Sequence, residues 1–211
     1  TMPPRPEERH PPRCSCYFKS TDGHVNVWDF SLKRLNLTLL ERFVATRDYG
    51  GCLLVDSSVR KVLPDSMSRT IPIWAAVLNR VVLRFIEEEE KKKKKDDKEG
   101  EDDDEDDDAG SSSSATAGRK RRRRRRPRRR GGGFWDTDLH TPRGVVPKEE
   151  HAAISNLLDE RVETLFRCGA IVDPAGLVDR LTKPLRVLWM NHEGKLYQSN
   201  VDDDDDDEAA N

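Results

Sequence analysis

The sequence predicts an α/β fold, with a small mixed or parallel sheet and flanking helices, interrupted by a long disordered charged insertion. One observation behind this is that short apolar runs, typical of strands, alternate with longer segments whose apolar residues recur at helical spacing. The other is the stretch 87–133, whose charged and small residues offer no apolar face to bury. It separates two ordinary blocks, 14–86 and 134–200, which we expect to form the first and second parts of one domain.

The overall composition hides a strong segregation of charge. The chain has 211 residues, 38 Lys and Arg against 40 Asp and Glu, and a net charge of -2. The acidic tail 201–211 and the Pro-rich start 1–13 are predicted to be disordered. No apolar run approaches the ~18 residues of a membrane span, and no signal-peptide core is present. The few, scattered cysteines argue against a disulfide scaffold and indicate a reducing compartment: Cys14, Cys16, Cys52 and Cys168.

The first block begins with local signals of strand, turn and helix. Residues 17–18 are expected to end a short strand, and the polar turn 20–23 follows it. Ser31 is placed to cap a helix that has one apolar face: Leu32, Leu35, Leu39 and Phe43. Residues 52–55 form a continuous apolar run, which predicts a fully buried strand of the kind found in parallel sheets.

A polar loop over 57–69 and a helix over 73–86 complete the first block. Ser68 or Thr70 can cap this helix, and Pro72 is acceptable in its first turn. Apolar residues cover much of its circumference, which predicts that it packs between layers: Trp74, Val77, Leu78, Val81, Val82 and Phe85.

The second block predicts a long helix, a helical turn and a β-like run. Pro147 opens the helix, which ends near Gly169 and has one apolar face: Ile154, Leu157, Leu158, Val162 and Leu165. A helical turn over 177–181 precedes the β-like run 185–190. Three tryptophans are expected in the core rather than on a base-stacking platform: Trp74, Trp135 and Trp189.

The P-loop, GxGxxG, GxSxG, HExxH and Cys-x5-Arg signatures are all absent, which leaves two polar clusters as candidate sites. The first combines a cation, two hydroxyls, a carboxylate, a glycine and an imidazole: Lys19, Ser20, Thr21, Asp22, Gly23 and His24. The glycine would let backbone amides approach a phosphate. On composition alone the preferred interpretation is a plain surface turn, because Asp-Gly is a common turn dipeptide.

The second cluster leads from the apolar run 52–55 to the start of the helix: Asp56, Ser57, Ser58, Arg60, Lys61, Asp65, Ser68, Arg69 and Thr70. In open α/β sheets, ligands bind beyond the carboxyl ends of strands, and helix N-termini favour anions. The alternative interpretation is a polar connecting loop with helix caps.

The charged insertion carries a strong but unspecific electrostatic signal. Eleven of the twelve positions in 119–130 are basic, which suits binding of RNA phosphates or nuclear import. The alternative is a tract that pairs with the acidic run 101–108. Four histidines outside the clusters lack ligand partners at useful spacing and are predicted to be ordinary surface or packing residues: His10, His140, His151 and His192.

Longer motifs make the chain recognisable. They are FKSTDGH at 18–24, PD-x-x-S-x-T-IPIW at 64–74, VLNR at 77–80 and KPLRVLW at 183–189. These motifs closely resemble the initiator tRNA phosphoribosyl transferase family, and the resemblance covers the stretches 17–40, 51–80, 141–151 and 183–189. The resemblance implies transfer of phosphoribose from phosphoribosyl pyrophosphate, the co-substrate, to the 2'-hydroxyl of a T-stem adenosine in initiator methionine tRNA. It also implies a divalent metal, Mg, and a cytoplasmic enzyme with no stable protein partner; import through 119–130 would make it nuclear instead.

The resemblance, read with the chemistry of this transfer, assigns roles to both clusters. Cations and a metal must stabilise the leaving pyrophosphate, and a base must accept the hydroxyl proton. Four cations are assigned to phosphates: Lys19, Arg60, Lys61 and Arg69. Asp56 or Asp65 would hold the metal, and Asp22 or His24 would act as base. The remaining residues of the motifs are assigned to substrate binding: Ser20, Thr21, Gly23, Ser57, Ser58 and Thr70.

Departures from the family pattern leave a second interpretation open. The family loop VDSTRRGKRMPD is one residue shorter here, as VDSSVRKVLPD, and no phosphatase-like C-terminal domain follows Trp189. We therefore expect a partial or truncated member, in which impaired substrate binding or activity is the alternative to a working enzyme. The competing function is a non-enzymatic nucleic-acid or basic-protein interaction factor that acts through the charged tracts.

Overall fold

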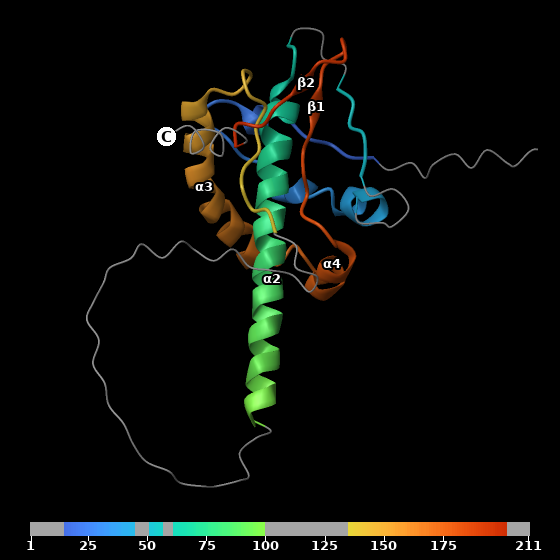
Figure 1. Cartoon of the computed structure of the whole chain (residues 1–211), viewed down its shortest axis with the longest axis vertical. Helices are drawn as coiled ribbons and strands as arrows, with labels where there is room; N and C mark the ends of the chain where they lie inside the picture. Colours follow the sequence, from blue (N-terminus) through green and yellow to red (C-terminus); the bar gives the residue numbers. More distant parts are fainter. Residues whose placement is uncertain (1–14, 45–50, 57–60, 100–134, 202–211) are drawn as a thin grey trace, which may run out of the picture.

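The computed structural model describes residues 15–44, 51–56, 61–99 and 135–201. Most of the regular secondary structure in these residues is helical (Figure 1). The central helix is α2 (Ile71–Glu99); α3 (Lys148–Arg167) and α4 (Pro174–Arg180) pack against it. Short helical turns precede α2 along the chain: η1 (Ser20–Gly23), η2 (Leu32–Arg34), α1 (Leu37–Leu39), η3 (Leu40–Val44) and η4 (Ser66–Thr70). Strands β1 (Trp189–Met190) and β2 (Leu196–Tyr197) form an antiparallel pair in which Trp189 faces Tyr197.

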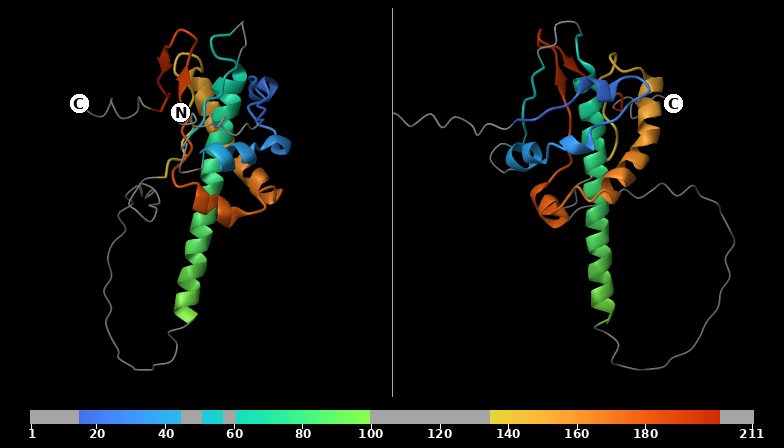
Figure 2. Two further views of the ribbon diagram at one scale, coloured as in Figure 1. Left: turned by 90° about the vertical axis from the view of Figure 1, so that its right-hand side faces the viewer. Right: turned by 180° about the vertical axis from the view of Figure 1, so that it is seen from behind.

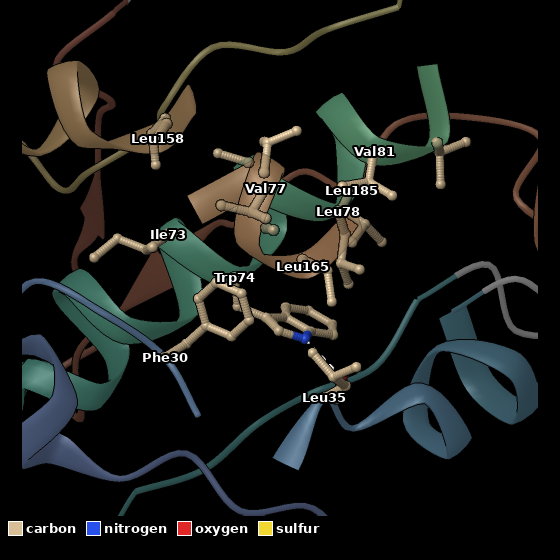
Figure 3. Close-up of a cluster of buried hydrophobic side chains, with 14 of the residues drawn as sticks. Phe30, Leu35, Ile73, Trp74, Val77, Leu78, Val81, Leu158, Leu165 and Leu185 are labelled. Atoms are coloured by element: carbon tan, nitrogen blue, oxygen red, sulfur yellow. Dashed lines mark hydrogen bonds between the residues drawn. The ribbon is translucent and has the colours of Figure 1, made fainter. Parts of the chain in front are cut away.

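One hydrophobic core surrounds the first half of α2 (Figure 3). The helix is buried on several sides, as its apolar circumference predicts, because side chains from both blocks cover it. Phe30 and Leu35 contribute from the first block, and Leu158, Leu165 and Leu185 from the second. Residues separated by the charged insertion therefore share a single core.

The three tryptophans expected in the core are all buried, which confirms that prediction. Each indole N–H donates to a backbone carbonyl: Trp74 to Leu35 at 2.7 Å, Trp135 to Asn79 at 2.8 Å and Trp189 to Met67 at 2.8 Å. A buried indole needs such a partner, because an unsatisfied N–H costs free energy. The tryptophans thus fix the loops around α2 as well as filling space.

The predicted small sheet is present, but its mixed or parallel character is not confirmed, since the sheet found in the described residues is the antiparallel pair β1–β2. The run 52–55, expected as a buried strand, belongs to no strand. Leu53 and Val55 are 82% and 81% exposed, and Leu54 is partly buried against the core. A four-residue apolar run is compatible with either environment, and here α2 with its flanking helices occupies the core. Residues 17–18 are not a strand either: the Tyr17 backbone bonds to the Asn36 side chain, at 3.1 Å and 3.2 Å.

The helix expected from Ser31 exists, but it is divided. Asn36 adopts a left-handed backbone conformation, with φ of 52°, between η2 and α1. Asn tolerates this conformation better than most residues, and its amide is held by Tyr17. The apolar face is nevertheless oriented as predicted, with Leu35 and Leu39 buried.

The helix predicted over 73–86 is confirmed and is longer at both ends. It follows directly on η4, which occupies the end of the predicted polar loop. It also continues through residues 87–99, which were predicted as part of the disordered insertion. Glu and Lys are good helix formers, and Glu87 lies four residues before Lys91, the favourable order for a helical pair. This charged half of α2 extends beyond α3 and α4 (Figures 1 and 2).

The second block largely follows its predicted elements. Helix α3 ends at Arg167, two residues before Gly169, whose φ is 63°, and α4 covers all but the last residue of the expected helical turn 177–181. Of the β-like run 185–190, only the last two residues form strand β1. Within the described ranges, no helix is both long and apolar enough to cross a membrane. The predictions for 1–13, 101–108, 119–130 and the acidic part of the tail lie outside the described residues.

Candidate active site

The two polar clusters of the first block lie against each other in the structure. Turn η1, from the first cluster, contacts η4, from the second, where the chain enters α2. Gly23 is buried there, and a Cβ on it would lie 2.6 Å from Thr70 Oγ1 and 2.9 Å from the Asp65 carbonyl oxygen. The close approach of the two segments therefore requires glycine, which a plain surface turn would not. The Thr70 hydroxyl adds a hydrogen bond to the Lys19 carbonyl at 3.3 Å.

Asp65 lies at the centre of the charges in this junction. Its side chain is 12% exposed and contacts three basic groups: His24 Nε2 at 3.3 Å, Lys61 Nζ at 2.8 Å and Arg69 Nη1 at 3.3 Å. A buried carboxylate requires such partners, because an unpaired charge away from water is strongly disfavoured. The Lys61 and His24 side chains remain 55% and 51% exposed. They can therefore contact Asp65 and still reach a ligand from solvent.

Arg69 is held from the second block by Glu150, in the first turn of α3. The guanidinium makes two parallel bonds, Nε to Oε1 at 2.7 Å and Nη2 to Oε2 at 2.8 Å. The hydrogen bond with Glu150 raises the pKa of Arg69, and the same bond holds the pKa of Glu150 below its usual range. Trp28 also donates to Glu150, at 3.0 Å. Both side chains of the pair are only about a tenth exposed, so Arg69 is fixed in place.

The other predicted site residues are distributed around this junction. Lys19 and Thr21 are exposed, whereas Ser20 and Asp22 are half-buried in η1. Asp56 accepts a hydrogen bond from Ser66 at 3.0 Å, which brings the segment 51–56 to the start of η4. Three predicted residues lie outside the described parts of the chain: Ser57, Ser58 and Arg60.

The carboxylates of the junction differ in their suitability for a metal. Where the chain is described, no group of three or more His, Cys, Asp or Glu side chains is arranged to hold an ion. Both Asp65 oxygens already contact basic groups, so this carboxylate has no open side for a metal. Asp56 is an exposed residue. A single carboxylate of this kind can help to hold a Mg²⁺ ion whose other ligands are mainly phosphates and waters.

Glu150 and Trp28 also belong to this site, although the sequence motifs did not point to either residue. Glu150 lies 81 residues from Arg69 in the sequence, and the charged insertion separates them. No local spacing connects such distant residues. The only sequence feature that pointed to Glu150 was its position beside His151, within the stretch 141–151 that resembles the family.

The family of the chain follows from comparison with known proteins. Residues 6–209 match the family described as the Rit1 N-terminal domain. The chain belongs to this family. That membership confirms the family resemblance found in the motifs of both blocks, and the match extends across the charged insertion. The Rit1 family motifs FKSTDGH and PD-x-x-S-x-T-IPIW are the segments that meet at the η1–η4 junction.

Two curated relatives support the assignment to the Rit1 family. The tRNA A64-2'-O-ribosylphosphate transferase of Saccharomyces cerevisiae is 34% identical over 188 residues, which cover 88% of this chain and 28% of the relative. An uncharacterised protein of Schizosaccharomyces pombe is 33% identical over 196 residues, which cover 92% of this chain and 32% of the relative. The chain thus spans less than a third of the length of these relatives. No solved structure matches it.

Proposed function

We propose that this chain carries the transferase site of a tRNA-modifying enzyme. In this proposal, phosphoribose passes from phosphoribosyl pyrophosphate to the 2'-hydroxyl of a T-stem adenosine in initiator methionine tRNA. The observation that carries the proposal is the η1–η4 junction, where the two family motifs meet and the exposed side chains of His24 and Lys61 contact the buried carboxylate of Asp65. The name of the S. cerevisiae relative supports a tRNA acceptor and a ribosylphosphate group.

The reaction exchanges one carbon–oxygen bond for another. The acceptor 2'-oxygen forms a bond to the anomeric carbon of the donor ribose, while the bond from that carbon to pyrophosphate breaks. The electron pair leaves with the pyrophosphate, and the ribose develops oxocarbenium character. Lys61 and Lys19 are assigned to the pyrophosphate oxygens, where fixed positive charge stabilises the developing negative charge.

His24 is assigned as the base that accepts the proton of the 2'-hydroxyl. Asp65 contacts its Nε2 at 3.3 Å and would orient the ring, leaving Nδ1 to accept the proton. A carboxylate that orients a histidine is a recurring arrangement for such bases. Asp22 stays the second candidate, because it lies in the same turn.

Arg69 takes a different role in this proposal from the one its charge suggests. Glu150 and Asp65 already occupy its guanidinium, so it positions Asp65 instead of binding phosphate. Asp56 would hold Mg²⁺ together with oxygens of the pyrophosphate. Such an ion would supply further neutralisation of charge on the leaving group.

The test is incubation of the purified chain with phosphoribosyl pyrophosphate labelled in its ribose and with initiator or elongator methionine tRNA. We expect label on the initiator tRNA only, and its loss by at least 100-fold in His24→Ala and Lys61→Ala. Lys183→Ala, an exposed cation outside the junction, serves as control. The S. cerevisiae relative is the positive control. Label on neither tRNA, while that control succeeds, would refute transfer by this chain.

The second candidate function is an interaction factor that acts through the charged tracts. One observation favours it: α2 carries the start of the insertion beyond α3 and α4 (Figure 1). Replacement of residues 100–133 by a short Gly-Ser linker separates the two functions. If transfer persists, the tracts are not required for it; if RNA binding disappears and no transfer is seen in either protein, the interaction factor is favoured.

A further inference from the structure

A basic hollow lies between the β1–β2 hairpin and the turn 142–146, outside the η1–η4 junction. It has a volume of about 480 Å³, is open to solvent, and is lined by these described residues: Arg143, Gly144, Lys195, Leu196, Tyr197 and Gln198. Two of them are cations and none is an acid. The Lys195 ammonium lies 5.4 Å from the centre of the Tyr197 ring, so a positive charge and an aromatic face share the hollow.

Two glycines leave the backbone beside the hollow accessible. Gly144 and Gly194 have φ angles of 76° and 81°, in the left-handed region that glycine favours. A Cβ on either would meet no atom within 4 Å, so both turns face open space. Each glycine is adjacent in sequence to one of the two cations, Arg143 and Lys195. A polymer can therefore approach the backbone of both turns at close range.

A buried polar network holds the two sides of the hollow together. His140 contacts Asp136 Oδ2 at 2.7 Å through Nε2 and Ser199 Oγ at 2.9 Å through Nδ1. Burial alone would raise the pKa of Asp136, but hydrogen bonds from His140 and the backbone, with nearby charges, lower it to about 2. The Asn200 amide donates to Thr141 Oγ1 at 2.9 Å. Such a satisfied network keeps the segments 136–146 and 196–200 in fixed register.

The hollow lies at the same end of the molecule as the candidate active site. Trp189 in β1 donates to the carbonyl of Met67 in η4, at 2.8 Å, which anchors the hairpin to the junction. Figures 1 and 2 show β1 and β2 at the end where α2 and α3 begin. A long substrate bound at the junction can thus continue over the hairpin.

We propose that this hollow binds the RNA backbone of the acceptor tRNA. Arg143 and Lys195 contact phosphates, and Tyr197 packs against a ribose or a base. The proposal rests on the proposed function, in which a tRNA is the acceptor. Phosphate contacts of this kind fix the register of a nucleic acid, while the site itself selects the nucleotide that reacts. An open hollow whose described lining contains two cations and no acid suits that task better than the enclosed pocket of a small ligand.

The test compares two double charge reversals in the full chain. Arg143→Glu with Lys195→Glu alters the hollow; Arg167→Glu with Lys183→Glu alters two exposed cations at the end of α3 and beyond α4. Affinity for an initiator tRNA transcript is measured by fluorescence anisotropy over a range of salt concentrations. We expect the hollow variant to bind about tenfold more weakly than the control variant. For the hollow variant, the slope of log affinity against log salt concentration should be smaller in magnitude by about 1 to 2.

Equal affinities and equal salt slopes in the two variants would overturn the proposal. Cross-linking of a 4-thiouridine-substituted transcript gives a second, local measurement, with adducts expected on the peptide that contains Tyr197. Lack of such adducts, in a protein that does bind the transcript, would also overturn it. The outcome is separable from that of the proposed function. If the parent chain shows no transfer activity, the proposed function fails. If the hollow variant of that same chain still binds the transcript more weakly than the control variant, the RNA-binding hollow is supported.

Discussion

Gly23 carries the strongest steric constraint among the residues of the junction. A methyl group there would lie within 3 Å of Thr70 Oγ1 and of the Asp65 carbonyl oxygen, which belongs to the backbone and cannot easily move. We expect Gly23→Ala to lower the free energy of unfolding by about 1–3 kcal/mol, the usual effect of overpacking. Urea denaturation measures this change.

Gly51→Ala is the matched control for this substitution. Gly51 is exposed, and a Cβ on it would meet no atom within 4 Å. Its unfolding free energy should stay within about 0.5 kcal/mol of the parent chain, as for most surface substitutions. Equal stability of all three proteins would show that η1 does not rest on η4 as closely as described.

Glu150 gives the second prediction for a single residue, which depends on pH. Since its folded-state pKa is lowered, chiefly by the bond to Arg69, the pair stabilises the fold above the ordinary glutamate pKa of about 4.3. The contribution is lost as the pH falls through the lowered pKa. We expect Glu150→Gln to cost about 1.5–3 kcal/mol at pH 7, the range for hydrogen bonds to charged groups. The difference in unfolding free energy between the parent chain and Glu150→Gln should therefore become smaller below about pH 4.

Glu163→Gln is the control, because its pair with Arg84 also joins α3 to α2 but is largely exposed. Exposed pairs contribute about 0–1 kcal/mol, so this change should have little effect at either pH. Urea denaturation at pH 7 and near pH 3 measures all three proteins. A cost for Glu150→Gln that is the same at both pH values would mean that the carboxylate charge is not what stabilises the contact.

At the scale of elements, long periodic helices could be predicted and short pieces could not. The apolar circumference of 73–86 and the single face of α3 identified both helices, because their pattern repeats over several turns. The run 52–55 has no such repetition. Whether it is buried depends on tertiary partners that the sequence does not display. The same limit applies to the site. The polar motifs were found, but the contact between η1 and η4 was not visible in local spacing. The role of Glu150 was not visible either, because it depends on how α3 packs against α2.

The charged half of α2 is an element whose helicity comes from its own sequence. This part of the helix extends past α3 and α4 (Figure 1), so we expect pairs within the helix, such as Arg84 with Glu88, to support it. We expect Lys92→Pro to reduce the far-UV helical signal, while Lys92→Ala preserves it. The free energy of unfolding should change by less than about 0.5 kcal/mol in both, because the core lies in the first half of the helix. A loss of stability in Lys92→Pro would instead mean that the charged half contacts the rest of the protein.

At the scale of the whole molecule, the central feature is one core built from two parts of the sequence. Leu78 and Val81 on α2 pack with Leu158 and Leu165 of α3 around the same apolar centre (Figure 3). The size of the two blocks predicted this continuity, because each block alone would bury too little surface to fold stably by itself. The extent of each part along the chain stays a prediction.

Cleavage of the connection tests that continuity. A protease site inserted at position 112, between the acidic and basic runs, would give two fragments that no covalent bond joins. We expect them to elute together in size-exclusion chromatography, because apolar burial across α2 and α3 does not depend on the connection. Leu158→Asp should separate the fragments after cleavage, whereas Asp159→Ala, at the neighbouring exposed position, should not. If the fragments of the parent chain separate at once, the two blocks are not held by a shared core, and the Arg69–Glu150 pair cannot couple them.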